Sequence, residues 1–181
     1  MAVADAANSL VGNANLISKV YFPRIIVPIA AVIVAFVDFL ISFAILVILL
    51  VWYLFMPGWQ ILLSPVFVGI AFMAILGVGV WITALNVKYR DFRYVIPFML
   101  QLGLYVSPVG FSSGIVPEQW RLLYALNPMV GVIDGFRWCL LGGESRIYGP
   151  SVWLSFTISA LLLWVGIRQF RKMERSFADL I

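Results

Sequence analysis

The sequence contains no histidine and only one cysteine, Cys139. General acid–base chemistry by histidine is therefore excluded, and so are zinc sites that need several cysteine or histidine ligands. A single cysteine also excludes a disulfide within the chain. No lysine follows a glycine, so the chain lacks the phosphate-binding loop of many ATP-hydrolysing proteins. If it works against a gradient, another subunit must supply the energy.

Charged side chains are also scarce, at 11% of the 181 residues, whereas 64% of the residues are hydrophobic. A soluble domain carries about 25% charged residues, because it needs a polar shell around its core. This chain has too few charges for such a shell, so lipid must be part of its surroundings. Because helices satisfy their own backbone polar groups in lipid, we expect an all-α membrane protein.

Long apolar runs define the expected membrane spans. A helix crosses the hydrocarbon core with about 20 residues, because the core is about 30 Å thick and each residue rises about 1.5 Å. Runs of this length predict three transmembrane helices, over residues 25–53, 61–87 and 150–168. A fourth span is predicted over 94–115, with an outer end that breaks or bends at its prolines and polar residues: Pro97, Gln101, Ser107 and Pro108.

Residues 116–141 are apolar but unsuited to a straight span. Within them, residues 122–141 contain the helix-breaking pair Asn127–Pro128 and two charged residues, Asp134 and Arg137. One charge at mid-bilayer costs at least about 2.5 kcal/mol, whereas broken backbone is tolerated where protein or water covers it. We therefore predict a re-entrant helical hairpin before the last span. Asp134 and Arg137 are three residues apart, a spacing that allows an ion pair on one helix face.

The basic residues fall mainly on one side of the predicted membrane. With four spans, nine of the twelve lie on the same face: Lys19, Arg24, Lys88, Arg90, Arg93, Arg168, Arg171, Lys172 and Arg175. The opposite face holds Arg121, Arg137 and Arg146. Because basic loops stay in the cytoplasm, we expect both termini of the chain there, with a cytoplasmic tail over residues 169–181.

Residues 1–24 precede the first predicted span and form a segment of their own. Leu10, Ile17 and Tyr21 recur at intervals of seven and four residues, which predicts a short amphipathic helix that Pro23 would end. Such a helix can dock a partner protein or lie on lipid, and the spacing alone favours lipid. The basic and aromatic loop over residues 86–94, taken alone, indicates a membrane anchor.

Asp38 lies near the middle of the first predicted span. A carboxylate at that depth predicts a functional site, although it can also serve only to bridge helices or be protonated there. The second predicted span contains Gly69, Gly77 and Gly79, small residues that favour close packing between helices.

Aromatic side chains are abundant in and around the predicted outer region: Tyr105, Phe111, Trp120, Tyr124, Phe136 and Trp138. Sugars stack on such rings, but tryptophan and tyrosine also form belts at membrane interfaces. Composition alone favours the belt.

Several polar strings make the sequence recognisable: Asn13–Arg24 (NANLISKVYFPR), Ala84–Tyr94 (ALNVKYRDFRY), Tyr124–Gly131 (YALNPMVG) and Gly135–Trp138 (GFRW). They resemble the permease subunit of type-2 ABC exporters, within them the class that moves lipid-linked O-antigen, capsule or teichoic acid chains. The resemblance implies a transport subunit, not an enzyme, in the bacterial cytoplasmic (inner) membrane.

The resemblance also implies partners. The permease would be a homodimer, embedded in membrane lipid and bound to two separate ABC ATPase subunits, with no nucleic acid. ATP would be bound by the ATPase, and the chain itself would hold no cofactor. Residues 1–24 would be the cytoplasmic coupling-helix region, and residues 25–181 would be the permease domain. For residues 1–24 the resemblance thus favours docking to a partner protein, whereas the spacing alone favoured a helix lying on lipid. Coupling to the ATPase would fall on Asn13, Asn15, Leu16, Lys19, Tyr21, Phe22, Arg24, Lys88, Arg90, Asp91 and Arg93.

An outer gate and glycan path would be formed by the hairpin region, with Trp120, Tyr124, Asn127, Pro128, Asp134, Arg137 and Trp138. Family permeases have six spans, and this chain resembles the last four. The amino-terminal gate helix and the first two spans are therefore expected to be missing.

Two other functions stay open from the residues alone. A membrane-embedded enzyme of glycan or lipid modification would need a pair of acid–base groups near one interface. A membrane scaffold without transport activity would need no such site. Co-purification with an ATP-binding subunit would separate a transporter from both.

Overall fold

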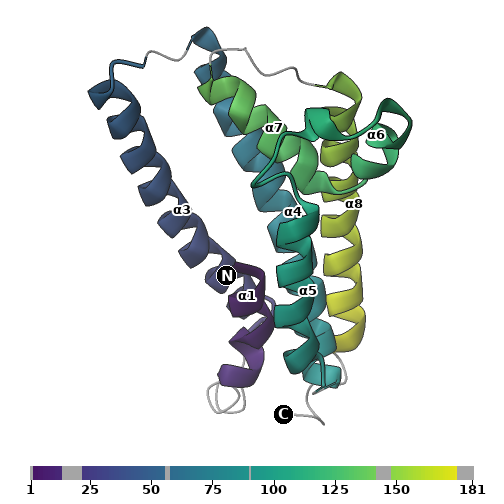
Figure 1. Ribbon diagram of the computed structural model, residues 1–181. Coiled ribbons are helices and arrows are strands. Elements are labelled where there is room, and N and C mark those ends of the chain that lie inside the picture. Colours follow the sequence, from purple (N-terminus) through teal and green to yellow (C-terminus); the bar gives the residue numbers. More distant parts are fainter. Residues whose placement is uncertain (1, 14–21, 56–57, 90, 142–147, 175–181) are drawn as a thin grey trace.

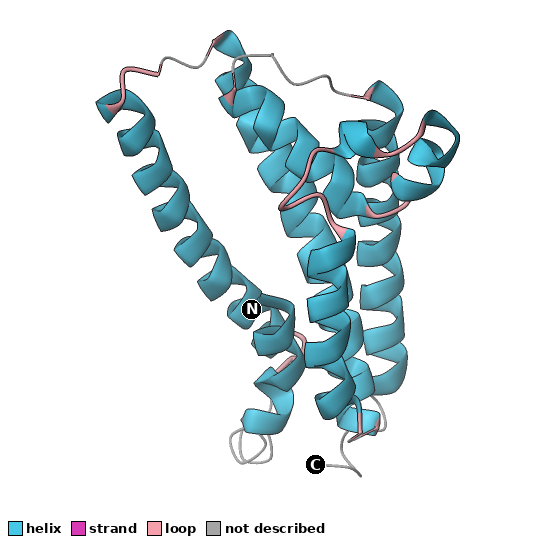
Figure 2. Cartoon of the chain, in the orientation of Figure 1, coloured by secondary structure: helices cyan, strands magenta, loops and turns pink. Residues whose placement is uncertain are grey.

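The computed structural model describes residues 2–13, 22–55, 58–89, 91–141 and 148–174. All regular secondary structure in these ranges is helical, with short loops between the helices (Figure 2). The prediction of an all-α protein is therefore confirmed.

Within the described ranges, three helical segments are long and apolar enough to cross a membrane. They are α3 (Ile26–Trp52), α4 (Ser64–Lys88), which continues from the 3-10 helix η1 (Trp59–Leu63), and α8 (Gly149–Glu174). Each corresponds in position to one of the three strongest apolar runs. Pro28 and Pro65 lie in the first turns of α3 and α4, where a backbone N–H has no helical partner to lose.

Helix α5 (Phe92–Val106) lies where the fourth span was predicted. Its 15 residues reach about 22 Å, less than the thickness of about 30 Å of the hydrocarbon core. The helix passes through Pro97 and ends at Ser107, which is extended because Pro108 disfavours the helical conformation in the residue before it. The outer end of this segment is thus broken, as the prolines predicted.

Two short helices follow, α6 (Glu118–Tyr124) and α7 (Pro128–Leu140), after the single turn η2 (Ser113–Ile115). They meet at the Asn127–Pro128 pair, where the hairpin of half-helices was predicted to break. The side-chain oxygen of Asn127 accepts from the N–H of Met129 at 3.0 Å, and Pro128 opens α7. An asparagine cap followed by proline is a strong start for a helix.

Helix α1 (Ala2–Gly12) lies in the first 24 residues. Leu10 is on this helix, but the helix ends at Gly12 and Asn13 lies in a turn. The predicted amphipathic helix therefore does not run unbroken to Pro23. Ile17 and Tyr21 lie outside the described residues. The buried side of α1 consists of Ala6, Ala7 and Leu10, small and apolar side chains that let the helix approach α4 closely.

The central pair of the fold is α4 and α8, which lie side by side (Figure 1). Along α8, Ser151, Ser155 and Ser159 are buried at intervals of four residues, on the side that faces its neighbours. Helix α7 packs on both α4 and α8 at the end where α8 begins. Small residues at these contacts allow the backbones to approach, which is how helices associate in lipid.

Helix α3 lies near α1 and α4 at its start and diverges from α4 toward its other end (Figure 1). Of its residues only Pro28 and Val32 are buried. Beyond Val32, α3 contacts its neighbours through phenylalanines. The ring centre of Phe36 lies 4.9 Å from that of Phe72 of α4. The last two turns of α3 are largely exposed and apolar, a surface for lipid or another chain.

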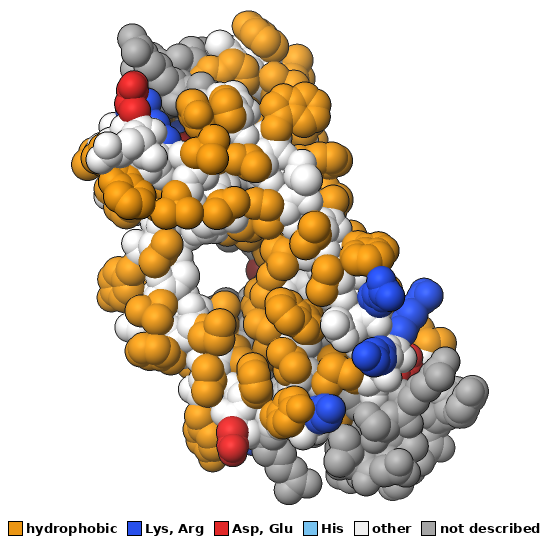
Figure 3. Space-filling view, turned by 90° about the vertical axis from the view of Figure 1, so that its right-hand side faces the viewer, with side chains coloured by type: hydrophobic (Ala, Val, Ile, Leu, Met, Phe, Trp, Pro, Cys, Tyr) orange, Lys and Arg blue, Asp and Glu red, His pale blue; other side chains and the backbone are white. Residues whose placement is uncertain are grey.

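Helix α5 also stands apart, since Ile96 is its only buried residue. The surface is largely apolar, and an opening passes through the molecule between α5 and the α4–α8 pair (Figure 3). Such a surface is suited to lipid and to other apolar partners rather than to water alone.

Candidate functional site

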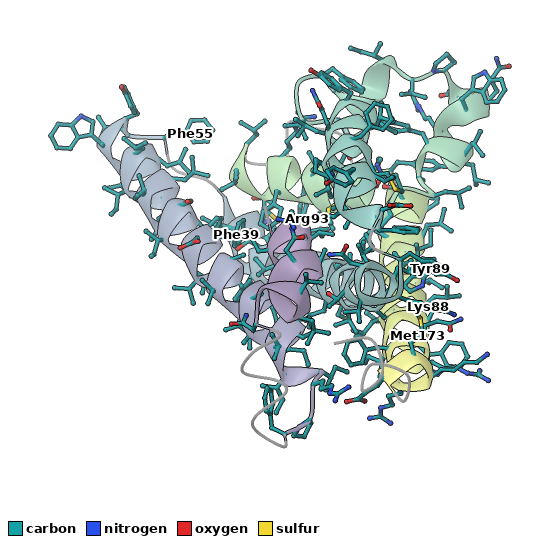
Figure 4. The ribbon with its side chains drawn as sticks, turned by 90° about the horizontal axis from the view of Figure 1, so that it is seen from below. Phe39, Phe55, Lys88, Tyr89, Arg93 and Met173 are labelled. Carbon is teal, nitrogen blue, oxygen red and sulfur yellow. The ribbon has the colours of Figure 1, made fainter. Side chains whose placement is uncertain are left out.

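One end of the helices carries a concentration of positive charge. Helix α4 ends there, α5 begins there, and α8 ends there (Figure 1). This end of the molecule is called the basic end below. Its described basic side chains are Arg24, Lys88, Arg93, Arg168, Arg171 and Lys172. Figure 4 views the molecule from this end, with Lys88, Tyr89 and Met173 close to the end of α8.

The basic end contains every predicted coupling residue that the structure describes: Asn13, Phe22, Arg24, Lys88, Asp91 and Arg93. Lys88, Asp91 and Arg93 are exposed at the end of α4, in the connection to α5 and in the first turn of α5, respectively. The Lys88 ammonium lies 5.3 Å from the centre of the Tyr89 ring. The remaining predicted coupling residues lie outside the described ranges: Asn15, Leu16, Lys19, Tyr21 and Arg90.

An apolar cluster under the basic end joins four parts of the chain. Its buried members come from α1, α4 and α8: Leu10, Val80, Ala84, Val87 and Phe170. Phe22 and Ile25, just before α3, pack against the same cluster. In addition, the backbone N–H of Arg24 donates to the Glu174 carboxylate at 3.3 Å. The two predicted coupling segments are therefore rooted in one packed core.

Two buried side chains of α4 bond to the backbone of α1. The Asn86 amide donates to the Ala7 carbonyl at 2.8 Å and to the Asn8 side-chain oxygen at 3.3 Å. The Thr83 hydroxyl lies 2.8 Å from the Ala6 carbonyl and 2.6 Å from the Gly79 carbonyl, and it has one proton to donate. Sequence reasoning did not single these residues out, although a buried asparagine in an apolar helix must find partners.

Asp38 is exposed on α3. The Ser42 hydroxyl, one turn further on, donates to the backbone carbonyl of Asp38 at 2.9 Å, not to the carboxylate. Among the described residues, no side chain bonds to that carboxylate. The structure therefore shows no bridge from Asp38 to a neighbouring helix of the described chain.

At the opposite end, Arg137 of α7 holds the loop that follows α5. Its guanidinium donates to the carbonyl of Phe111 at 2.6 Å and to that of Val109 at 3.0 Å. The Asn127 amide donates to the Ser107 hydroxyl at 3.0 Å. These bonds satisfy polar groups of the loop that follows α5, and they fix this loop against α7.

Asp134 is buried on the same helix. It does not form the ion pair with Arg137 that their spacing allowed, because the guanidinium is turned to the loop carbonyls. The Asp134 carboxylate interacts with the Ser113 hydroxyl in the same loop. Both charged residues of α7 therefore contact the 107–113 loop, which sequence spacing could not reveal.

The predicted glycan-path aromatics do not form a single surface. Trp120 is 55% exposed on α6, and Tyr124 lies 6.4 Å from Phe111 between ring centres. Trp138 instead packs edge-on against Trp59 of η1, at 6.0 Å. Phe136 lies among phenylalanines of α3 and α4: Phe39, Phe43 and Phe67. Trp120 is thus the predicted tryptophan most open to a ligand.

Comparison with known proteins matches residues 1–141 to the ABC-2 type transporter family. The chain is 29% identical over 187 aligned positions to the O-antigen export system permease protein RfbA of Klebsiella pneumoniae, which covers 98% of this chain and 70% of that protein. It is 28% identical over 182 positions to RfbA of Myxococcus xanthus, covering 99% and 69%. With most of its length matched and with helices suited to a membrane, the chain belongs to the ABC-2 type transporter family of membrane permeases.

Proposed function

We propose that the chain is the permease subunit of an ATP-driven exporter that moves lipid-linked polysaccharide across the cytoplasmic membrane. The observation that carries the proposal is the match over nearly the whole chain to permeases named for O-antigen export. The exported polymer would be of the O-antigen, capsule or teichoic acid type. A separate ABC ATPase would bind and hydrolyse ATP, and two copies of the permease would form the transport path.

The membrane arrangement that we propose has four crossings, namely α3, α4, α5 and α8, with α6 and α7 as a re-entrant hairpin. The basic end would face the cytoplasm, because loops rich in lysine and arginine are retained there. This places both termini of the chain on the cytoplasmic side. Helix α5 is short for a full span, and its extension by the 107–115 loop is supported by the hydrogen bonds of that loop to α7.

Coupling to the ATPase would occur at the basic end. The described candidates are Asn13, Phe22, Arg24 and three exposed residues where α4 ends and α5 begins: Lys88, Asp91 and Arg93. The apolar cluster beneath them contains side chains from α1, α4 and α8, so a displacement imposed on the loops would move several helices together. This rigid root supports a role in transmitting the ATPase motion to the spans.

The polymer would leave at the opposite end, past α6 and α7. Exposed rings such as Trp120 offer faces on which sugars stack, and Asn127, Asp134 and Arg137 hold the loop that follows α5. Pro128 begins the helix that carries two of these three residues. Movement of this loop would open or close the exit, while Asp38 on α3 would face the path or the partner copy.

The proposal is tested by tagging the chain at its chromosomal locus and purifying it in mild detergent. We expect an ABC ATPase subunit to co-purify in a fixed ratio, and deletion of the gene to leave lipid-linked polymer on the cytoplasmic side. A permease that purifies without any ATPase, or a deletion strain with normal surface polysaccharide, would contradict the proposed function. A glycan- or lipid-modifying enzyme would instead leave polymer export intact and change its structure.

A further inference from the structure

The link between α1 and α4 is polar, buried and made by side chains of one helix to the backbone of the other. Asn86 is 2% exposed, and both hydrogens of its amide are used, on the Ala7 carbonyl and on Asn8. A buried amide that loses its partners costs about 1–3 kcal/mol, so the bonds keep α1 in one register on α4. Close contact adds to this, since Ala6 lies against Gly79.

The position of Asn86 gives this link a mechanical consequence. Asn86 lies two residues before Lys88, where the second predicted coupling segment begins. It bonds to Ala7 of α1, five residues before Gly12, where α1 ends and the chain enters the first predicted coupling segment. The apolar cluster of Leu10, Val80, Ala84, Val87 and Phe170 lies on the same two helices and on α8. One amide therefore joins the roots of both segments that the proposed function assigns to the ATPase.

We propose that Asn86 is a positioning residue that holds α1 and α4 as one rigid body throughout the transport cycle, so that both coupling segments deliver a single displacement to α4. The inference rests on the proposed function. It differs from a purely structural role, because a structural bond matters for folding alone, whereas this one sets how much polymer moves for each ATP hydrolysed. Helix α5, which makes little contact with α4, lies outside the rigid body.

The first test locks the two helices covalently. A Cβ atom on Gly79 would lie 3.1 Å from that of Ala6, within a few tenths of an ångström of the range of about 3.5–4.5 Å that a disulfide needs. The Ala6→Cys, Gly79→Cys pair is made in a Cys139→Ser background, which removes the native cysteine. The control pair, Ala6→Cys with Gly69→Cys, places the second cysteine ten residues away along α4, about 15 Å, where no bond can form.

If α1 and α4 move as one body, oxidation of the 6–79 pair leaves ATP-driven export unchanged relative to the reduced protein and to the control pair. If the two helices must slide on each other, oxidation blocks export and reduction restores it, which would overturn the inference. Wild-type complex that hydrolyses ATP and exports polymer is the reference in both cases. Failure of that reference would instead count against the proposed function.

The second test removes the amide. Asn86→Leu keeps the volume but donates no hydrogen bond, and we expect polymer exported per ATP hydrolysed to fall roughly 2- to 30-fold, the range seen for residues on a coupling route. Oxidation of the 6–79 pair in the same protein should restore the ratio. Thr157→Val, which removes an exposed hydroxyl bonded within α8, should leave it unchanged.

An unchanged ratio in Asn86→Leu, or a lowered ratio that the disulfide does not restore, would contradict the inference. If Asn86→Leu fails to accumulate in the membrane, the first test decides whether α1 and α4 move as one body. The 6–79 disulfide is made there in a protein that keeps Asn86, so the amide stays in place.

Discussion

Gly77 of α4 and Gly166 of α8 lie against each other, so that a Cβ atom on Gly166 would overlap the carbonyl group of Gly77. A Cβ atom on Gly77 would in turn lie 2.5 Å from the backbone of Leu162 and Leu163. No side chain at these contacts can swing aside, because backbone atoms form both surfaces. The close packing of α4 on α8 therefore requires glycine at both positions, because any other residue would carry a Cβ atom there.

This contact predicts the effect of adding one methyl group. Gly77→Ala or Gly166→Ala should push α4 and α8 apart and lower the free energy of unfolding by about 1–3 kcal/mol, the cost of overpacking. Gly69→Ala is the matched control in α4, because nothing lies within 4 Å of its Cβ position. It should be neutral or raise stability by up to about 1 kcal/mol. Thermal unfolding in detergent measures all three, and equal stability of Gly69→Ala and Gly77→Ala would contradict this packing.

Arg137 predicts a local effect on the 107–113 loop. Arg137→Met removes both hydrogen bonds to the carbonyls of Val109 and Phe111, and a hydrogen bond to a charged group contributes about 1.5–3 kcal/mol. Amide hydrogen exchange of the loop should accelerate roughly tenfold or more, while α4 and α8 stay protected.

Glu118→Gln provides the control for Arg137. It breaks the exposed ion pair to Arg121 at the same end of the molecule, and exposed pairs contribute roughly 0–1 kcal/mol. Loop exchange should therefore match the wild type. Unchanged exchange in Arg137→Met would show that the guanidinium does not hold the loop.

Trp120 predicts an effect on export without an effect on folding. Its ring is 55% exposed, so Trp120→Ala should leave the amount of permease unchanged and lower polymer export about 2- to 10-fold, as expected for a lost ring contact. Trp153→Ala is the control, since Trp153 is 75% exposed near the start of α8, which lies at the same end. Trp138→Ala is less decisive, because it also removes the packing against Trp59. Equal export by the Trp120 and Trp153 variants would remove Trp120 from the glycan path.

Asp38 predicts a separation between stability and transport. Since no side chain among the described residues bonds to its carboxylate, Asp38→Asn should leave thermal stability unchanged or raise it, because burial of a charge in lipid is costly. If the carboxylate faces the path or the partner copy, export should fall. Ser42→Ala, which removes only a hydroxyl bonded to the backbone, should export normally. Normal export by Asp38→Asn would leave the carboxylate without a transport role.

Much of the fold could be predicted from the sequence, because length and apolarity decide which segments can cross a membrane. The three long helices α3, α4 and α8 follow from those quantities, and the break at Ser107–Pro108 follows from the geometry of proline. The start of α7 at Asn127–Pro128 could be predicted for the same reason.

Contacts between distant residues could not be predicted in this way. Gly77 was recognisable as a packing residue, but nothing in the sequence names Gly166 as its partner. Gly69 is a glycine of the same helix, yet no atom of the described residues lies within 4 Å of its Cβ position. The spacing of Asp134 and Arg137 pointed to an ion pair, whereas the guanidinium bonds to loop carbonyls that only the folded chain brings near. Asn86 bonds to residues about 79 positions earlier, so its role depends on the packing of α1 on α4.

The central claim, that the chain is the permease of a polysaccharide exporter, is tested most directly by transport in inside-out membrane vesicles. Vesicles that contain the chain and its ABC ATPase are given lipid-linked polymer on their outer surface, and polymer protected from an added glycosidase is measured with time. The account predicts that protected polymer accumulates with ATP and does not accumulate with a non-hydrolysable analogue or without the chain. Vesicles in which the ATPase is bound and hydrolyses ATP, yet no polymer becomes protected, would contradict it.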